Sequence, residues 1–265
     1  MLKAVVFDWA GTTVDYGSRA PMGAFVKVFA EFGVDISVAE ARGPMGLPKW
    51  DHIKALLDDP AIAARWQKAH GRAPDKADVD RIYEVFVPLN ARVVTDYSDL
   101  IPGTVEAVAD ARRRGLKIGS TTGYTREIME PLLPVAKAQG YAPDNLVCAG
   151  DLAAGRPTPL MMYRCFADLG VWPAEAVVKV DDTVPGIAEG RAAGSWTVGV
   201  AMSGNALGLS LDEVLALSEP DRQARRARAV RELAEGGAHH VIDSIADLPA
   251  LLDVIEARLA AGERP

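Results

Sequence analysis

The sequence contains only two cysteines, Cys148 and Cys165, among its 265 residues. This number implies no disulfide framework, so the chain is not one of the small secreted domains that depend on one. No apolar run approaches the roughly 20 residues that a bilayer-spanning helix needs. The chain opens on a strand-like run, Leu2 to Phe7, and not on a cleavable signal peptide. We therefore expect a protein of the reduced cytoplasm that has no membrane partner.

The sequence also has fewer basic residues than acidic ones. Lysine and arginine total 29 against 36 aspartates and glutamates, which leaves a net charge of −7. Nucleic-acid-binding proteins usually carry a basic excess, so the sequence predicts no nucleic-acid partner. A small anionic substrate is compatible with this balance, because a local basic cluster can oppose the overall sign. The length suits one large domain, or a core domain with a smaller insert.

Short apolar runs alternate along the chain with longer segments of helical periodicity. The runs are apolar almost throughout, which is typical of strands buried on both faces of a sheet. The repeated strand-then-helix order predicts an α/β fold with a doubly wound, Rossmann-like parallel sheet. The expected strands are 4–7, 116–119, 146–148, 177–180, 197–200 and 240–242, and the expected core helices are 103–114, 124–138, 158–169, 184–194 and 244–261.

The first and second expected strands are separated by residues 8–115, far more chain than one crossover requires. Apolar residues recur there at helical intervals, over 20–32, 48–57, 60–69 and 76–94. We predict an inserted small α-helical cap domain over 17–99 and a Rossmann-like catalytic core over 1–16 and 100–265. Ligands of open α/β sheets bind outside the carboxyl ends of the strands, so this cap would cover the ligand site.

Polar side chains follow several expected strands at their carboxyl ends. They are Asp8 after the first, Thr122 after the second, Arg156 after the third, and Asp181 with Asp182 after the fourth. Parallel strands present these ends at one edge of the sheet, where we expect the side chains to converge. An isolated strand-end aspartate is more often a helix cap or a turn residue. The whole set in this order indicates a catalytic site.

These residue types suit the transfer of a phosphoryl group to a carboxylate. Asp8 is the expected nucleophile. Mg²⁺, held by Asp8, Asp182 and the backbone carbonyl of Ala10, would offset the repulsion between carboxylate and phosphate. Thr122 can donate a hydrogen bond to a phosphoryl oxygen, and Arg156 can neutralise charge on the nucleophile and the transferring group.

The same residues resemble the motifs of the haloacid dehalogenase superfamily of aspartate-nucleophile phosphotransferases, over almost the whole chain. The predicted insert matches the position of the small helical cap in that superfamily. Its phosphatases generally carry a second aspartate two positions after the nucleophile, which protonates the leaving oxygen and then activates water. Ala10 occupies that position here. An ordinary phosphate-ester hydrolase would therefore lack its acid.

The predicted cap offers a different chemistry in the segment Pro44 to His52. Pro48 suits a first helical position, which puts Lys49 in the first turn, where the helix dipole disfavours the ammonium form. Burial would act in the same direction, and a partly neutral lysine can form a Schiff base with a carbonyl. His52 lies three residues on, shares a helix face with Lys49 and could shuttle protons. A solvated lysine and a packing histidine are the ordinary interpretations of these residues taken singly.

Three segments narrow the resemblance to the phosphonatase branch of that superfamily: 7–17, 45–52 and 119–127. The resemblance implies hydrolysis of the phosphonate substrate phosphonoacetaldehyde to acetaldehyde and phosphate with Mg²⁺, and a homodimer formed through the caps. It also implies that Met45, Gly123 and Tyr124 bind substrate near the Schiff base. One departure is Gly186, because relatives often carry an acid four positions after the equivalent of Asp182.

Two alternatives stay open from the sequence. A phosphatase or phosphomutase of the same superfamily would act on a phosphate ester, but Ala10 does not suit it and Lys49 would have no covalent function. A catalytically silent binding protein would not need four residues intact, namely Asp8, Thr122, Arg156 and Asp182. Cleavage of a carbon–phosphorus bond explains Ala10 better, because an iminium on Lys49 lets the leaving carbon depart as an enamine while Asp8 takes the phosphoryl group.

Overall fold

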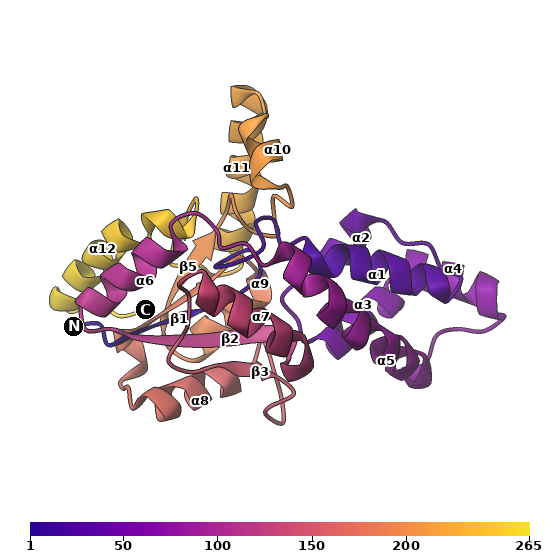
Figure 1. Ribbon diagram of the computed structural model, residues 1–265, viewed down its shortest axis with the longest axis horizontal. Coiled ribbons are helices and arrows are strands. Elements are labelled where there is room, and N and C mark those ends of the chain that lie inside the picture. Colours follow the sequence, from indigo (N-terminus) through magenta and orange to yellow (C-terminus); the bar gives the residue numbers. More distant parts are fainter.

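The computed structural model describes residues 1–265 as a layered α/β core with a helical body at one end of its sheet (Figure 1). The sheet has six strands in the order β3-β2-β1-β4-β5-β6, and all neighbouring pairs are parallel. The predicted doubly wound parallel sheet is thereby confirmed. The strands are β1 (Ala4–Phe7), β2 (Lys117–Thr125), β3 (Val147–Ala149), β4 (Val177–Asp181), β5 (Trp196–Val200) and β6 (His240–Ile242).

Helices cover both faces of this sheet. The core helices are α6 (Thr104–Arg113), α7 (Arg126–Ala138), α8 (Leu160–Leu169), α9 (Val184–Ala192), α10 (Leu211–Leu215), α11 (Glu219–Glu235) and α12 (Leu248–Ala260), with 3₁₀ turns η2 (Ala174–Ala176) and η3 (Ile245–Asp247). Successive strand residues point to opposite faces. Val5 and Phe7 of β1 accordingly join an apolar cluster with α6, α7 and α12, whereas Ala4 and Val6 join one with α8. This central position of β1 places its carboxyl end in the middle of the sheet edge.

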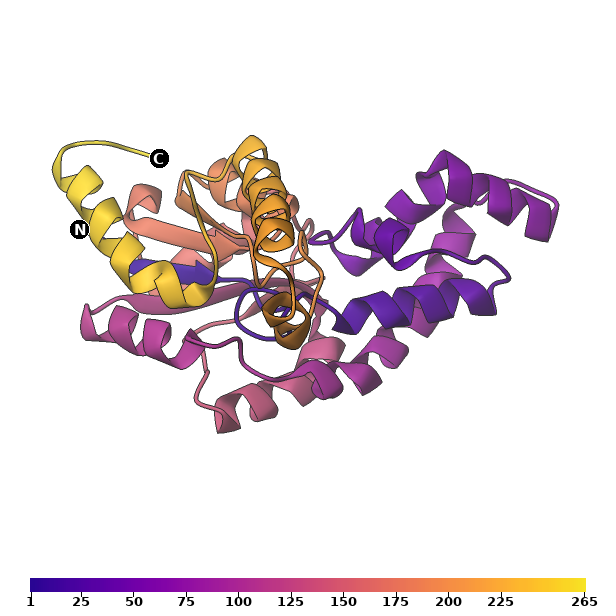
Figure 2. The same cartoon turned by 90° about the horizontal axis from the view of Figure 1, so that it is seen from above.

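Most of the chain between β1 and α6 forms the helical body, which lies beyond the carboxyl edge of the sheet in both views (Figures 1 and 2). Its elements are α1 (Ala20–Glu31), α2 (Val38–Arg42), α3 (Lys49–Asp58), α4 (Pro60–His70), α5 (Lys76–Val93) and the 3₁₀ turn η1 (Val94–Tyr97). Its interior includes Phe25 and Phe86, whose stacked rings have centroids 4.2 Å apart. The predicted helical cap inserted after the first strand is therefore present.

Three local features differ from the sequence-based expectation. Strand β2 continues through residues 120–125, which are buried up to Tyr124, and Thr121, Thr122 and Thr125 pair with β3, with an irregularity between Thr122 and Thr125. The short helix α2 was not predicted, although a capping box of Ser37 and Glu40 begins it. Pro48 is the N-cap of α3 and not its first residue, a shift of one position that leaves Lys49 in the first turn.

The helices and the two cysteines agree with the expectations of no membrane-spanning helix and no disulfide framework. None of the helices combines the length and the apolarity needed to cross a bilayer. Cys148 and Cys165 are free thiols buried in the core. Burial raises the pKa of Cys148 to about 12 and that of Cys165 to about 11. Both thiols are therefore protonated at neutral pH and chemically inert.

Candidate active site

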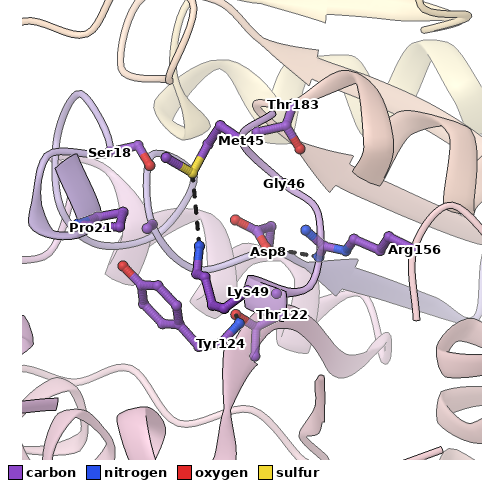
Figure 3. Close-up of a pocket in the computed structure, with 12 residues that line it drawn as sticks. Asp8, Ser18, Pro21, Met45, Gly46, Lys49, Thr122, Tyr124, Arg156 and Thr183 are labelled. Carbon is purple, nitrogen blue, oxygen red and sulfur yellow. Dashed lines mark hydrogen bonds and ion pairs between the residues drawn. The ribbon is translucent and has the colours of Figure 1, made fainter. Parts of the chain in front are cut away.

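A pocket lies where the cap meets the carboxyl edge of the sheet (Figure 3). The core lines it with Asp8, Ala10, Thr122, Gly123, Tyr124, Arg156 and Thr183, and the segment that enters and forms the cap lines it with Ser18, Pro21, Met45, Gly46 and Lys49. All of the predicted site residues except His52 and Asp182 are in this lining. Those two lie directly behind it, next to residues that do line it.

Asp8 follows β1 immediately, and its backbone N–H donates to Val180 O at 3.0 Å, which continues the sheet pairing to the catalytic edge. Arg156 Nη2 donates to Asp8 Oδ1 at 2.8 Å, and both side chains are buried (Figure 3). Burial and the nearby Asp181 carboxylate raise the pKa of Asp8 to about 6, against the opposing charge of Arg156. Asp8 is therefore a poorly hydrated carboxylate at neutral pH, which suits a nucleophile.

Arg156 is held by a buried network that the sequence did not predict. Its guanidinium donates to Thr121 O at 2.8 Å and lies 3.3 Å from Glu189 Oε2. Lys179 Nζ donates to Thr121 Oγ1 at 2.7 Å and lies 3.3 Å from the same Glu189 oxygen. One signal was present: Lys179 stands inside the apolar run of β4, and a buried ammonium requires partners. The network fixes the orientation in which Arg156 reaches Asp8.

Three buried carboxylates, those of Asp8, Asp181 and Asp182, place oxygens within 4.8 Å of one another. Asp182 accepts hydrogen bonds from Thr12 Oγ1 at 3.2 Å and from the backbone N–H of Asn205 at 2.7 Å. Burial and the charges of Asp8 and Asp181 raise the pKa of Asp182 well above its ordinary value. A divalent cation would relieve this repulsion, and hard cations prefer carboxylate oxygens. The donor set therefore fits a divalent metal.

Asp181 is engaged differently, in a way that explains Gly186. Its Oδ1 accepts hydrogen bonds from Thr183 N at 3.0 Å and Thr183 Oγ1 at 2.7 Å, while Oδ2 lies 3.2 Å from Arg156 and 3.1 Å from Lys179. Burial would raise the pKa of Asp181, but the two cations prevail and lower it. A Cβ at Gly186 would lie 1.9–2.3 Å from this carboxylate group. Position 186 therefore holds glycine because Asp181 occupies its side-chain space.

Lys49 enters the pocket from the first turn of α3 and is only 3% exposed. Its Nζ lies 4.0 Å from Met45 Sδ and 5.0 Å from the centroid of the Tyr124 ring (Figure 3). No carboxylate lies within ion-pair distance of this nitrogen. Burial is the chief cause that lowers the pKa of Lys49 to about 8, and Asp8 opposes it. The amine is therefore neutral in a substantial fraction of molecules at mildly alkaline pH, as a Schiff-base lysine requires.

His52 lies on the same face of α3 and is fully buried, with its ring stacked on Phe25 at a centroid distance of 4.0 Å. Its Nε2 is 2.9 Å from Ala41 O, and a carbonyl can only accept, so Nε2 carries the proton. The other nitrogen, Nδ1, has no hydrogen-bond partner. Burial and the charge of Lys49 hold the pKa of His52 well below its ordinary range. The ring is therefore neutral and has one free acceptor nitrogen.

Glycines let the cap loop that carries Met45 lie directly on the core. A Cβ at Gly123 would lie 2.9 Å from Leu47 O, and one at Gly46 would lie 2.2 Å from Thr183 Oγ1. The sequence analysis assigned Gly123 to substrate binding, and the structure adds a close approach to the cap. Larger residues at these positions would hold the pocket open to water.

Four lining residues had not been predicted: Ser18, Pro21, Gly46 and Thr183. Gly46 and Thr183 adjoin the predicted Met45 and Asp182, so their neighbourhood was a usable signal. Ser18 lies just before α1 and Pro21 lies in its first turn, and nothing in their residue types marks them as pocket residues. Their place depends on how the chain turns into α1, where Ser18 has a positive φ of 50°.

Comparison with known proteins agrees with this geometry. A family model of haloacid dehalogenase-like hydrolases matches residues 2–194. Phosphonoacetaldehyde hydrolase from Paraburkholderia xenovorans (strain LB400) is 54% identical over 264 residues, which cover 100% of this chain and 99% of that protein. The enzyme of the same name from Bordetella pertussis is 52% identical, covering 100% and 96%. A crystal structure of a phosphonoacetaldehyde hydrolase-like protein from Oleispira antarctica has a TM-score of 0.98 at 44% identity, covering 100% and 96%.

Proposed function

The chain belongs to the haloacid dehalogenase-like hydrolase family, and from that premise we propose that it hydrolyses the carbon–phosphorus bond of phosphonoacetaldehyde to acetaldehyde and phosphate. The observation that carries the chemistry is the placement of Lys49. It is a buried amine with no carboxylate partner and a lowered pKa, held by the cap in the same pocket as Asp8. A phosphate-ester hydrolase has no use for such an amine.

The reaction begins with the neutral Lys49 amine, which attacks the aldehyde carbon and expels water to form an imine. Protonated, this imine accepts the electron pair of the carbon–phosphorus bond, so the leaving carbon becomes part of an enamine as the phosphoryl group passes to Asp8. The enamine then takes a proton on carbon, and water releases acetaldehyde and the free amine. A second water hydrolyses the aspartyl phosphate to phosphate. His52, neutral and with Nδ1 free, moves protons during imine formation and breakdown.

Thr122 and Arg156 act on the phosphoryl group in this scheme. Thr122 lies beside Asp8 in the pocket, and its hydroxyl donates to a phosphoryl oxygen. Arg156 already donates to Asp8 Oδ1, so it reduces the charge that the nucleophile presents to phosphorus. Met45 and Tyr124 pack around the Lys49 amine and exclude water from the imine, while Gly123 lets the phosphoryl group approach the backbone.

We propose Mg²⁺ as the metal, held by the carboxylates of Asp8 and Asp182 and by the backbone carbonyl of Ala10. When bound, it supplies positive charge that offsets the repulsion between the phosphonate and the Asp8 carboxylate. The raised pKa values of Asp8 and Asp182 support a cation between them. Ala10 contributes no acid, and none is needed when carbon, and not an ester oxygen, leaves phosphorus.

Reductive trapping tests the imine. The protein is incubated with phosphonoacetaldehyde and borohydride, and the modified peptide is mapped by mass spectrometry. We expect one adduct, on Lys49, because imine formation requires a neutral amine next to the substrate carbonyl. Lys54 on the same helix is exposed and paired with Asp58, so a Lys54→Arg variant should give the same adduct. Turnover without an adduct on any lysine would contradict the mechanism.

The pH dependence follows from the Lys49 amine. Its pKa is lowered to about 8 from an ordinary value near 10.4, so the neutral fraction grows as pH rises and is nearly complete about one unit above 8. We expect kcat/KM to increase with pH through about 8 and to level off about one unit higher, because this parameter reports groups of the free enzyme. A profile still rising at about pH 10 would show an ordinary lysine and count against the assignment.

The proposal also covers the domain boundaries, the oligomeric state, the cellular location and the lack of a nucleic-acid partner. We place the domain boundaries at 16/17 and 99/100, which is supported by helices α1 to α5 all lying between them. The resemblance to phosphonatases supports a homodimer formed through the caps. Two reduced, buried cysteines support a cytoplasmic enzyme, and the net charge of −7 supports the absence of a nucleic-acid partner.

A further inference from the structure

Arg42, the last residue of α2, extends its guanidinium out of the cap toward the core. Its Nη1 donates to Gly17 O at 2.8 Å, Asn205 Oδ1 at 3.1 Å and Ser18 O at 3.3 Å, and Nη2 donates to Gly208 O at 3.1 Å. One side chain thus joins three parts of the molecule. These parts are the cap, the segment that leads from β1 into α1, and the core loop that follows β5.

All of these acceptors are neutral oxygens. Arg42 is partly buried, and Asp15 and Asp182 are close enough to influence its pKa, yet neither forms an ion pair with it. Breaking a buried ion pair between a guanidinium and a carboxylate would leave an unpaired buried charge, which makes such a contact costly to open. Carbonyl acceptors can be hydrated again when the contact breaks. The bonding of Arg42 therefore suits a joint that opens and closes.

The core loop is shaped to receive this side chain. Gly208 has a φ of +68°, and a Cβ there would lie 2.6 Å from Arg42 Nε. The side-chain amide of Asn205 donates back to Arg42 O at 3.5 Å, so Asn205 and Arg42 contact each other through two hydrogen bonds. The backbone N–H of Gly17 donates to Ser203 O at 2.8 Å, which ties the connecting segment to the same loop.

This loop also reaches the reaction site. The backbone N–H of Asn205 donates to Asp182 Oδ2 at 2.7 Å, and Ser203 Oγ donates to Gly11 O at 3.1 Å. Ser18, whose carbonyl accepts from Arg42, lines the pocket. Arg42 is therefore linked to an Asp182 oxygen through one residue, Asn205, and contacts the pocket wall directly at Ser18.

We infer that Arg42 is a positioning residue that clasps the cap shut and, through Asn205, orders Asp182 for the reaction. The inference rests on the proposed function, because closure matters only if Lys49 of the cap must meet a substrate held by Asp8 of the core. Arg42 touches no reacting atom. It acts by raising the fraction of molecules in which the two halves of the site are together.

Arg42→Met keeps the apolar stem and removes the donors. Several charge-assisted hydrogen bonds are lost, so we expect kcat/KM to fall roughly tenfold to a hundredfold. Arg42→Lys should recover part of this loss. The matched control is Arg65→Met, which removes a cap arginine that pairs only with Glu40 of the cap and with Ala61 O and should leave kcat/KM unchanged.

Hydrogen exchange of the substrate-free protein provides a readout that does not depend on activity. In Arg42→Met we expect faster exchange in peptides covering 15–20 and 203–209, with the cap interior around Phe25 and Phe86 unchanged. Unchanged exchange in these peptides together with unchanged kcat/KM would overturn the clasp. If the wild type itself does not hydrolyse phosphonoacetaldehyde, the proposed function fails, while the exchange data still decide whether Arg42 closes the cap.

A second variant protects the test against misfolding. Asn205→Ala removes one acceptor and the return bond but keeps the backbone N–H that contacts Asp182. We expect a smaller loss in the same direction. The effects of Arg42→Met and Asn205→Ala should be less than additive in the double variant, because both remove the same contact. Fully additive losses in kcat/KM would overturn the coupling of Arg42 to Asp182 through Asn205. If Arg42→Met does not fold, an Asn205→Ala enzyme with unchanged kcat/KM would by itself overturn that coupling.

Discussion

Replacing Lys49 by arginine is expected to lower kcat for phosphonoacetaldehyde hydrolysis by about 10⁴-fold or more, the scale on which loss of a covalent catalytic group acts. A guanidinium remains protonated and does not form the imine, so the carbon–phosphorus bond has no electron sink. The substitution keeps a long stem beside Met45 and the ring of Tyr124. We therefore expect the fold to survive while the chemistry is lost.

The measurement is steady-state release of acetaldehyde and phosphate, with thermal unfolding as the check on folding. Lys54→Arg is the matched control, because Lys54 lies on the same helix but is exposed and bonded to Asp58. It should retain wild-type turnover. A folded Lys49→Arg enzyme with substantial residual kcat would show that the imine is not required.

Replacing Asp8 by asparagine is expected to reduce kcat to a similar degree, by about 10⁴-fold or more, because the phosphoryl group has no acceptor. The amide has the same shape and can still accept from Arg156 Nη2, which lies 2.8 Å from Asp8 Oδ1 in the native site. The imine step does not use the Asp8 carboxylate. We therefore expect borohydride to trap substrate on Lys49 in Asp8→Asn as it does in the wild type.

These two variants separate the two halves of the reaction. Lys49→Arg should give neither adduct nor product, whereas Asp8→Asn should give the adduct without phosphate. Asp151→Asn is the control for the aspartate, because Asp151 also follows a strand, β3, but bonds to Arg126 and Cys148 N outside the pocket. Phosphate release by Asp8→Asn at near wild-type rates would assign the acceptor to another residue.

Much of the fold could be predicted because its signals are local. The buried strands β1 and β4 are read from short apolar runs, and the cap from the length of chain between β1 and β2. The end of β2 could not be predicted in this way. Its polar residues remain in the sheet because partners distant in sequence satisfy them, as Lys179 and Glu189 do for Thr121 Oγ1. Sequence periodicity carries no information about such partners.

The residues of the candidate site also fall into those that local sequence signals predict and those that depend on distant partners. Asp8, Thr122 and Asp182 stand at strand ends, where the sheet topology alone brings them together. The contacts of Arg42 depend on how the cap helix α2 packs against the core loop after β5, and no spacing in the sequence indicates them. The lowered pKa of Lys49 was predicted in direction from its helical position and from burial under the cap, and burial is its largest cause.

The contact between Asp181 and Gly186 constrains how this site can change over evolutionary time. The carboxylate of Asp181 fills the space that any side chain at position 186 would need. An acidic residue at 186 would therefore require the Asp181 carboxylate to move away or position 181 to become smaller. The two positions behave as one epistatic unit. A carboxylate introduced at 186 while Asp181 is kept would bring a steric clash with it.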